Sequence, residues 1–211
     1  MPRSLEPVTL VGEHVRLEPL TRAHASGLAA AAASGPRDTY AFTAVPDGEE
    51  SAARYVDAAL ALHAQGTALP FATVDAASGR VVGSTRYLNV EFWAWPAGNP
   101  FQRGEDLPDV VEIGSTWLAP AAQRTPINTE AKLLMLTHAF ETWRVHRVTL
   151  KTDARNERSR AAILRLGATF EGVIRAQMIA YDGGIRDTAW YSILDSEWPA
   201  VKAGLATKLR S

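Results

Sequence analysis

Cysteine is absent from the 211 residues of this chain. Disulfide bridges, thiolate metal sites and an acyl-enzyme carried on cysteine are therefore excluded. The five histidines are scattered and lack the short spacings that metal ligands share, so we expect no metal site. The glycine-rich motifs of dinucleotide-binding folds and P-loop enzymes are missing as well, which argues against both classes.

A surplus of charge of one sign is also missing, since 22 basic residues face 23 acidic ones and the net charge is −1. We therefore expect no nucleic-acid partner. No apolar run approaches the length of a membrane span, and the start does not resemble a signal peptide, so we expect a cytoplasmic protein without membrane contact. The length and the 46% hydrophobic content favour a single domain over residues 1–211.

The apolar patterns predict a mixed α/β order, of the α+β kind, with hairpins at both ends. Alternation predicts strands at Val8–Pro19, Leu69–Val74, Arg80–Val90, Val110–Leu118, Val145–Lys151, Phe170–Ala180 and Arg186–Leu194. Helical spacing and capping residues predict helices at Thr21–Ala33, Asp47–Gln65, Thr129–Trp143, Asn156–Leu166 and Asp195–Leu209. Trp93–Pro108 breaks both patterns and is predicted to be a surface loop.

The segment Leu118–Asn128 joins the central predicted strand to a strongly helical run. A strand that turns sharply into a helix aims free backbone N–H groups and the positive end of the helix dipole at one point. Such a point suits a ligand rich in phosphate. The chemistry beside this segment therefore decides the function.

Several motifs follow one another in an order that resembles the GNAT N-acetyltransferase superfamily. They include Leu10–Pro19, Leu118–Asn128, Asp153–Ser159, Leu164–Gly167 and Arg186–Asp187, so that the resemblance covers most of the chain. It is strongest to the RimJ/RimL-type branch, which acetylates protein N-termini and small amines. The resemblance implies a central, mixed, mostly antiparallel sheet flanked by helices, with acetyl-CoA as the cosubstrate and no metal.

The phosphate loop departs from the pattern of the superfamily, which usually reads Gln/Arg-x-x-Gly-x-Gly/Ala. Gln123 and Arg124 fit its opening, but Pro126 and Asn128 stand where small residues are expected. Proline brings no N–H, so one donor to the phosphates is lost. We expect cofactor binding through the remaining loop groups, which are the side chains of Arg124 and Asn128 and the N–H groups of Thr125, Ile127, Asn128 and Thr129.

Glu112 interrupts an apolar strand. By alternation it shares a face with Gly114 and Leu118, opposite Trp117. A carboxylate in such a place is costly unless it has a partner or stays neutral. The resemblance implies a catalytic glutamate at this position, which would take a proton from the acceptor ammonium through water. The alternative is a structural glutamate paired with a strand arginine such as Arg86.

Asn156 and Ser159 open a predicted helix, where simple N-capping is one interpretation. The resemblance implies that the asparagine contacts the pantetheine arm and that the serine lies near the sulfur. Many relatives use a tyrosine where this chain has Ile163, so Ser159 becomes the candidate for stabilising the thiolate. The resemblance also implies that the backbone of Trp117 and Leu118 binds the oxyanion and the pantetheine.

These observations predict an acetyl-CoA-dependent N-acetyltransferase that moves acetyl directly to a primary amine of a protein N-terminus or a small molecule. We expect a monomer or homodimer. A non-catalytic acyl-CoA-binding or regulatory module is the alternative, and a partner-binding protein that retains only the scaffold is a further one. The acceptor is expected beside the Trp93–Pro108 loop, with its aromatic residues as walls, and the Tyr181–Arg186 turn; the alternative is that these aromatic residues cover the core edge or a dimer contact. Arg186 and Asp187 are expected to form an ion pair, and the resemblance implies a role on the substrate side.

Overall fold

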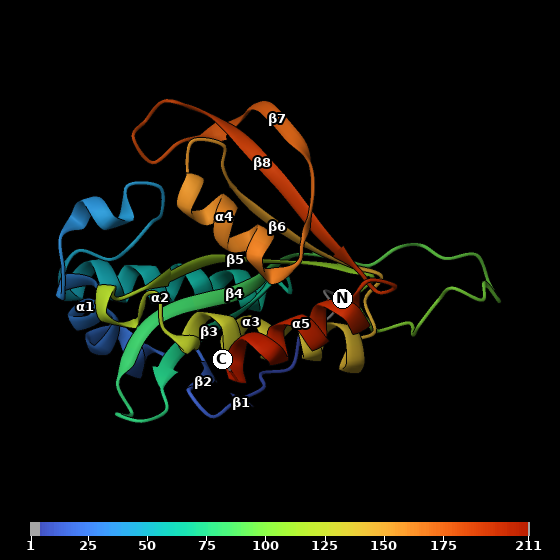
Figure 1. Ribbon diagram of the computed structural model, residues 1–211, viewed down its shortest axis with the longest axis horizontal. Helices are drawn as coiled ribbons and strands as arrows, with labels where there is room; N and C mark the ends of the chain where they lie inside the picture. The colour runs from blue at the N-terminus through green and yellow to red at the C-terminus, as the bar shows by residue number, and fades with distance from the viewer. Residues whose placement is uncertain (1–4, 211) are drawn as a thin grey trace.

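The computed structural model describes residues 5–210, which form one eight-stranded sheet with helices on both faces (Figure 1). The strands are β1 (Leu10–Val11), β2 (Val15–Pro19), β3 (Ala68–Asp75), β4 (Val81–Glu91), β5 (Val110–Leu118), β6 (Arg147–Asp153), β7 (Thr169–Ile179) and β8 (Ile185–Leu194). The α-helices are α1 (Ala25–Ala33), α2 (Gly48–Ala64), α3 (Pro126–Thr137), α4 (Glu157–Leu166) and α5 (Trp198–Arg210). Shorter turns of helix occur at Arg22–His24, Arg37–Tyr40, Pro120–Ala122 and His138–Thr142.

The strand order is β1-β2-β3-β4-β5-β6-β8-β7. All neighbours are antiparallel except β5 and β6, which are parallel and are joined by the crossover through α3. The expected fold, a mixed and mostly antiparallel sheet flanked by helices, is confirmed. Among the helices of residues 5–210, none has the length and apolar content that a bilayer crossing requires.

Side chains alternate between two apolar clusters on the two faces of the sheet. On β3, Phe71 packs in the larger cluster with residues of α3 and α5, whereas Ala72 and Val74 pack in the smaller one with α1 and α2. This period of two is what a strand buried on both faces requires. The sheet is therefore a rigid layer that positions the ends of α3 and of the central strands.

The strand expected over Val8–Pro19 is wrong as a continuous element, because β1 and β2 form a small hairpin. The carboxylate of Glu130 on α3 accepts hydrogen bonds from the backbone N–H groups of Glu13, His14 and Val15, at 2.9, 2.6 and 2.9 Å. These donors would otherwise lie unpaired against the helix. Glu130, more than a hundred positions further along the chain, thus stabilises the turn between β1 and β2.

The alternation expected along β5 is also wrong beyond Gly114. Ser84 pairs with Trp117 and Arg86 with Gly114, so β5 carries one extra residue there, and Ser115 has a φ of 47°. Such a bulge moves all later side chains to the other face. Trp117 therefore packs in the smaller cluster with α1 and α2, while Leu118 joins the larger cluster, the reverse of the expectation.

Candidate active site

The sheet opens between its two parallel strands. Within the described residues, β5 and β6 are paired only from Val110 opposite Arg147 to Glu112 opposite Thr149. Both strands continue, to Leu118 and Asp153, and the gap between them is part of a cavity of about 750 Å³. Beyond Glu112, the edge of β5 that faces this gap offers backbone groups to a ligand, as an edge strand does.

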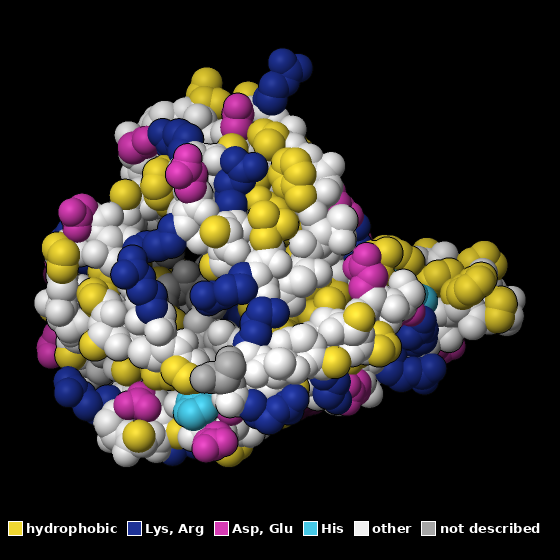
Figure 2. All heavy atoms as spheres, viewed as in Figure 1, with side chains coloured by type: hydrophobic (Ala, Val, Ile, Leu, Met, Phe, Trp, Pro, Cys, Tyr) yellow, Lys and Arg dark blue, Asp and Glu magenta, His cyan; other side chains and the backbone are white. Residues whose placement is uncertain are grey.

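Two helix N-termini meet at this cavity. Thr125 caps α3, since its Oγ1 accepts from the N–H of Ile127 at 3.3 Å, and Asn156 caps α4. Both helix dipoles therefore direct positive charge at the cavity. Basic side chains outnumber acidic ones in its lining: Arg124, Lys132, Lys151, Arg158, Arg165 and Arg186 against Glu112 and Asp153. Figure 2 shows basic side chains gathered around a hollow, which suits a polyanionic ligand.

The predicted phosphate loop is built around Gln123. Its Nε2 donates to the carbonyl of Leu118 at 2.9 Å and its Oε1 accepts from Arg158 at 3.4 Å, so this side chain shapes the loop. Arg124 turns the chain with a φ of 61°. Pro126 is the first residue of α3, where an N–H has no partner inside the helix and its loss costs little.

Not every predicted cofactor residue reaches the cavity. Thr125 and Asn128 line it, as do Gln123 and Arg124, but Ile127 and Thr129 do not. The side chain of Ile127 packs in the core, and its N–H is already bonded to Thr125. The expectation that Ile127 and Thr129 donate to the cofactor therefore lacks support from their positions.

Glu112 lies at the point where β5 and β6 diverge and is 7% exposed. Its Oε2 accepts from Asn89 Nδ2 at 2.8 Å and pairs with Lys151 Nζ at 2.7 Å. The alternative that Glu112 pairs with Arg86 is wrong, because its ion-pair partner is Lys151. The guanidinium of Arg86 instead lies over the ring of Tyr55, 5.3 Å from its centre. The carboxylate thus has partners on both neighbouring strands, and it still lines the cavity.

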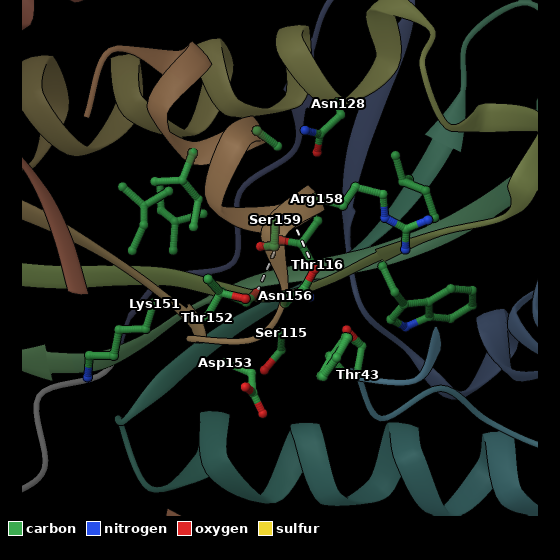
Figure 3. Close-up of a pocket in the computed structure, with 18 of the residues that line it drawn as sticks. Thr43, Ser115, Thr116, Asn128, Lys151, Thr152, Asp153, Asn156, Arg158 and Ser159 are labelled. Atoms are coloured by element: carbon green, nitrogen blue, oxygen red, sulfur yellow. Dashed lines mark hydrogen bonds between the residues drawn. The ribbon is translucent and has the colours of Figure 1, made fainter. Parts of the chain in front are cut away.

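Asn156 and Ser159 lie at the start of α4, as Figure 3 shows. Asn156 Oδ1 accepts from the N–H of Ser159 at 3.0 Å, so the capping interpretation holds for the carbonyl of this amide. Both residues line the cavity, as do Trp117 and Leu118. Capping and ligand binding are compatible here, because the cap leaves the amide nitrogen of Asn156 and the hydroxyl of Ser159 for the cavity.

Lys132 is a buried cation that sequence reasoning missed. It is 4% exposed, lines the cavity from α3, and donates to Thr116 Oγ1 at 2.7 Å and Thr85 Oγ1 at 3.0 Å. Burial lowers the pKa of Lys132 to about 7. A charged residue at a helical position between apolar neighbours was the available signal in the sequence.

The low pKa of Lys132 makes stability depend on pH. In the unfolded chain this amine keeps its proton up to about pH 10.4, whereas the folded form releases it near 7. The free-energy cost of burying the Lys132 amine is therefore absent at a pH above the pKa of the unfolded chain. It grows as the pH falls and is constant below about pH 7. From about pH 9 to pH 7 we expect the wild type to lose about 2 kcal/mol relative to Lys132→Met, measured by urea unfolding. Parallel profiles for the two proteins would contradict this.

Charged contacts surround Asp153, which lines the cavity at the end of β6. Arg155 makes paired bonds to Asp153, with Nε–Oδ1 3.0 Å and Nη2–Oδ2 2.8 Å, and its Nη1 reaches Asp182 at 2.8 Å. These hydrogen bonds lower the pKa of Asp153 below its ordinary value. Arg155 therefore ties the end of β6 to the turn between β7 and β8.

The acceptor region differs from expectation in two respects. Arg186 and Asp187 do not pair, because Asp187 Oδ1 accepts from the N–H of Ala176 at 2.7 Å while Arg186 lines the cavity. None of residues 93–108, all of them described, lines the cavity, so the loop part of the expected acceptor site lacks support, whereas Tyr181 and Arg186 of the expected turn do line it. The loop extends as an arm from the far end of β5 (Figure 1), where Trp93 stacks on His146 at 5.6 Å.

Asn89 and Lys151 complete the surroundings of Glu112, and sequence reasoning missed both, as it missed Asp153. Lys151 and Asp153 share one face of β6 with Arg147 and Thr149, so a fully polar face on this strand was the available signal. Asn89 has a φ of 47°, which asparagine tolerates better than most residues. Among residues 5–210, no three His, Asp or Glu side chains cluster as metal ligands.

Comparisons with known proteins agree with this geometry. The model of the family described as "Acetyltransferase (GNAT) domain" matches residues 14–169. The chain is 35% identical over 91 residues to the Bacillus subtilis (strain 168) protein named "Putative ribosomal N-acetyltransferase YdaF". That match spans 43% of this chain and 49% of the relative, so it extends over about half of that protein.

Solved structures share the whole architecture. A GCN5-related N-acetyltransferase from Brucella melitensis superimposes with a TM-score of 0.79 and 33% identity, over 98% of this chain and 87% of that chain. RimJ of Mycobacterium smegmatis, solved in complex with CoA-disulfide, shares the fold with a TM-score of 0.74 and 21% identity, over 98% and 95% of the two chains. Because the family model covers well over half of the sequence, this chain belongs to the GNAT family of N-acetyltransferases.

Proposed function

We propose that the protein transfers acetyl from acetyl-CoA directly to a primary amine, within a complex that holds both substrates. The observation that carries this proposal is the opening between β5 and β6, which leads from two helix N-termini to the carboxylate of Glu112. The cationic lining suits the phosphates of coenzyme A. The unpaired edge of β5 suits the amides of its pantetheine arm.

The residues present fit acetyl-CoA in order along the cavity. Arg124 and the N-terminus of α3 would bind the pyrophosphate, and Arg158 and Arg165 line the same cavity. The free edge of β5 near Trp117 can hydrogen-bond the amides of the pantetheine arm. Asn156, the N-cap of α4, lines the same cavity.

Acetyl-CoA supplies a thioester whose carbonyl carbon is attacked by the neutral amine. Glu112 Oε2 would receive the proton of the acceptor ammonium, through water, while its contact with Lys151 holds the carboxylate in position. The hydroxyl of Ser159 would donate a hydrogen bond to the thiolate as it leaves. Both groups act through position, since they line one cavity.

Binding of acetyl-CoA should raise the melting temperature with ligand concentration, as linkage requires. Arg124→Ala should weaken binding by about 1–3 kcal/mol, because a charge-assisted bond to phosphate is lost. Titration calorimetry measures this directly. Arg80→Ala is the matched control, since Arg80 is exposed in the β3–β4 turn away from the cavity.

Release of free coenzyme A in the presence of a panel of amines then tests catalysis. Binding of acetyl-CoA without any amine-dependent release would support the alternative, a non-catalytic acyl-CoA-binding module. Absence of both binding and release would overturn the cofactor assignment. Equal affinities of Arg124→Ala and Arg80→Ala would place the phosphates elsewhere.

A further inference from the structure

Arg186 is a cation whose side chain has no hydrogen-bond or ion-pair partner among residues 5–210. It lies on β8, is half-buried and lines the cavity. Its Nε is buried and has no hydrogen-bond partner among residues 5–210. A buried guanidinium N–H without an acceptor costs free energy, and an anionic ligand bound to the Nη groups of the same guanidinium would offset that cost.

The nearby carboxylates are already engaged. Asp153 holds Arg155 through both of its oxygens, and Asp182 binds the same arginine. Asp187 is bonded to the N–H of Ala176 on β7. The charge of Arg186 helps to lower the pKa of Asp153. The two side chains nevertheless form no ion pair. The guanidinium is therefore available to a further anion.

The face of β8 that carries Arg186 is rich in unsatisfied donors. Arg186, Thr188 and Trp190 are alternate residues, and each has a buried polar atom without a partner among the described residues: Nε, Oγ1 and Nε1. Trp190 pairs with Lys151 across the strands, and Lys151 Nζ lies 3.7 Å from its ring centre. Of these three residues only Arg186 lines the cavity, so its charge is the one that a ligand in the cavity would meet.

We propose that the acceptor carries a carboxylate in addition to its primary amine, and that Arg186 binds this carboxylate. The proposal rests on the proposed function and specifies the substrate of the same site. The amine would lie toward Glu112, and the carboxylate would lie toward the turn between β7 and β8. A guanidinium matches a carboxylate with two parallel hydrogen bonds, so Arg186 would fix orientation as well as affinity.

Two sources of such a carboxylate are separable with matched acceptors. Alanine against alaninamide tests a free amino acid. Amidated peptides with Asp or Asn at the second position test a protein N-terminus with an acidic side chain. Acetyl transfer would be measured with wild type, Arg186→Met, Arg186→Lys and Arg175→Met. Arg175 is the control because it is exposed on β7 and does not line the cavity.

With one carboxylate-bearing acceptor, we expect Arg186→Met to raise KM roughly ten- to hundredfold. The uncharged partner of that acceptor should react equally with wild type and variant, and Arg186→Lys should recover part of the loss. Arg175→Met should behave as wild type. The pair that shows the effect identifies the source of the carboxylate.

Equal losses for charged and uncharged acceptors would overturn the proposal, as would wild-type kinetics in Arg186→Met. If the methionine variant fails to fold, as judged by its melting curve with acetyl-CoA, the comparison of Arg186→Lys with wild type decides. If the wild type acetylates no amine, the proposed function fails. Thermal stabilisation of the coenzyme A complex by the same acceptors then tests Arg186 separately, and no selectivity for the carboxylate would overturn it.

Discussion

Replacing Glu112 with glutamine should lower kcat for acetyl transfer by roughly a hundredfold, within the range that positioned general bases contribute. Glutamine keeps the size of the side chain and its bond to Asn89, but it cannot take up a proton. Affinity for acetyl-CoA should stay nearly unchanged, because Glu112 lies at the closed end of the β5–β6 opening, away from the helix N-termini.

The pH profile separates catalysis from structure for this variant. At high pH the acceptor amine is already neutral and needs no base, so the deficit of Glu112→Gln should shrink as the pH rises. Glu141→Gln is the matched control, since Glu141 is also paired with a lysine, Lys202 at 2.6 Å, but lies outside the cavity. A deficit that is the same at every pH would assign Glu112 a structural role through Lys151.

Replacing Glu130 with alanine should lower the free energy of unfolding by about 3 kcal/mol, because three backbone donors lose their acceptor. Val15 is fully buried and cannot turn to water, whereas Glu13 is exposed and can. For a chain of this size, the melting temperature should fall by roughly 6–12 °C. Calorimetry or a fluorescence melt measures the shift.

Glu130→Gln should recover only a small part of this loss. The amide keeps one oxygen, but its NH₂ group faces N–H donors that it cannot satisfy. Glu105→Ala serves as the control, because Glu105 is exposed on the arm. A change below about 1 kcal/mol in Glu130→Ala would mean that water replaces the carboxylate at the β1–β2 turn.

Features that depend on neighbours along the chain were predictable from the sequence. Asn156 caps α4 as expected, and Gly167 ends that helix with a φ of 100°, which only glycine adopts at low cost. The fold of the family could also be predicted, because the order of its motifs is a property of the sequence. Pro126 still removes one N–H from the phosphate loop, but as the first residue of α3 it leaves the helix itself intact, and this position was not expected because the helix was predicted to begin at Thr129.

The departures from expectation arise where two distant segments meet. The bulge at Ser115 is a mismatch in register between β4 and β5, and strict alternation along one strand cannot reveal it. The partner of Glu112 is Lys151, on a strand that is adjacent only through the parallel pairing of β5 and β6. The aromatic content of the Trp93–Pro108 arm suggested a wall of the acceptor site. The arm instead precedes the start of β5, and its residues do not line the cavity.

Periodicity, helix caps and turn residues act over a few positions of the chain. The identity of the elements, the start of α4 and the family could therefore be predicted from the sequence. The divergence of β5 from β6, the burial of Lys132 and the unpartnered Arg186 came from packing. Their energies depend on which groups become neighbours after the chain has closed over long distances, and on how much water is then excluded.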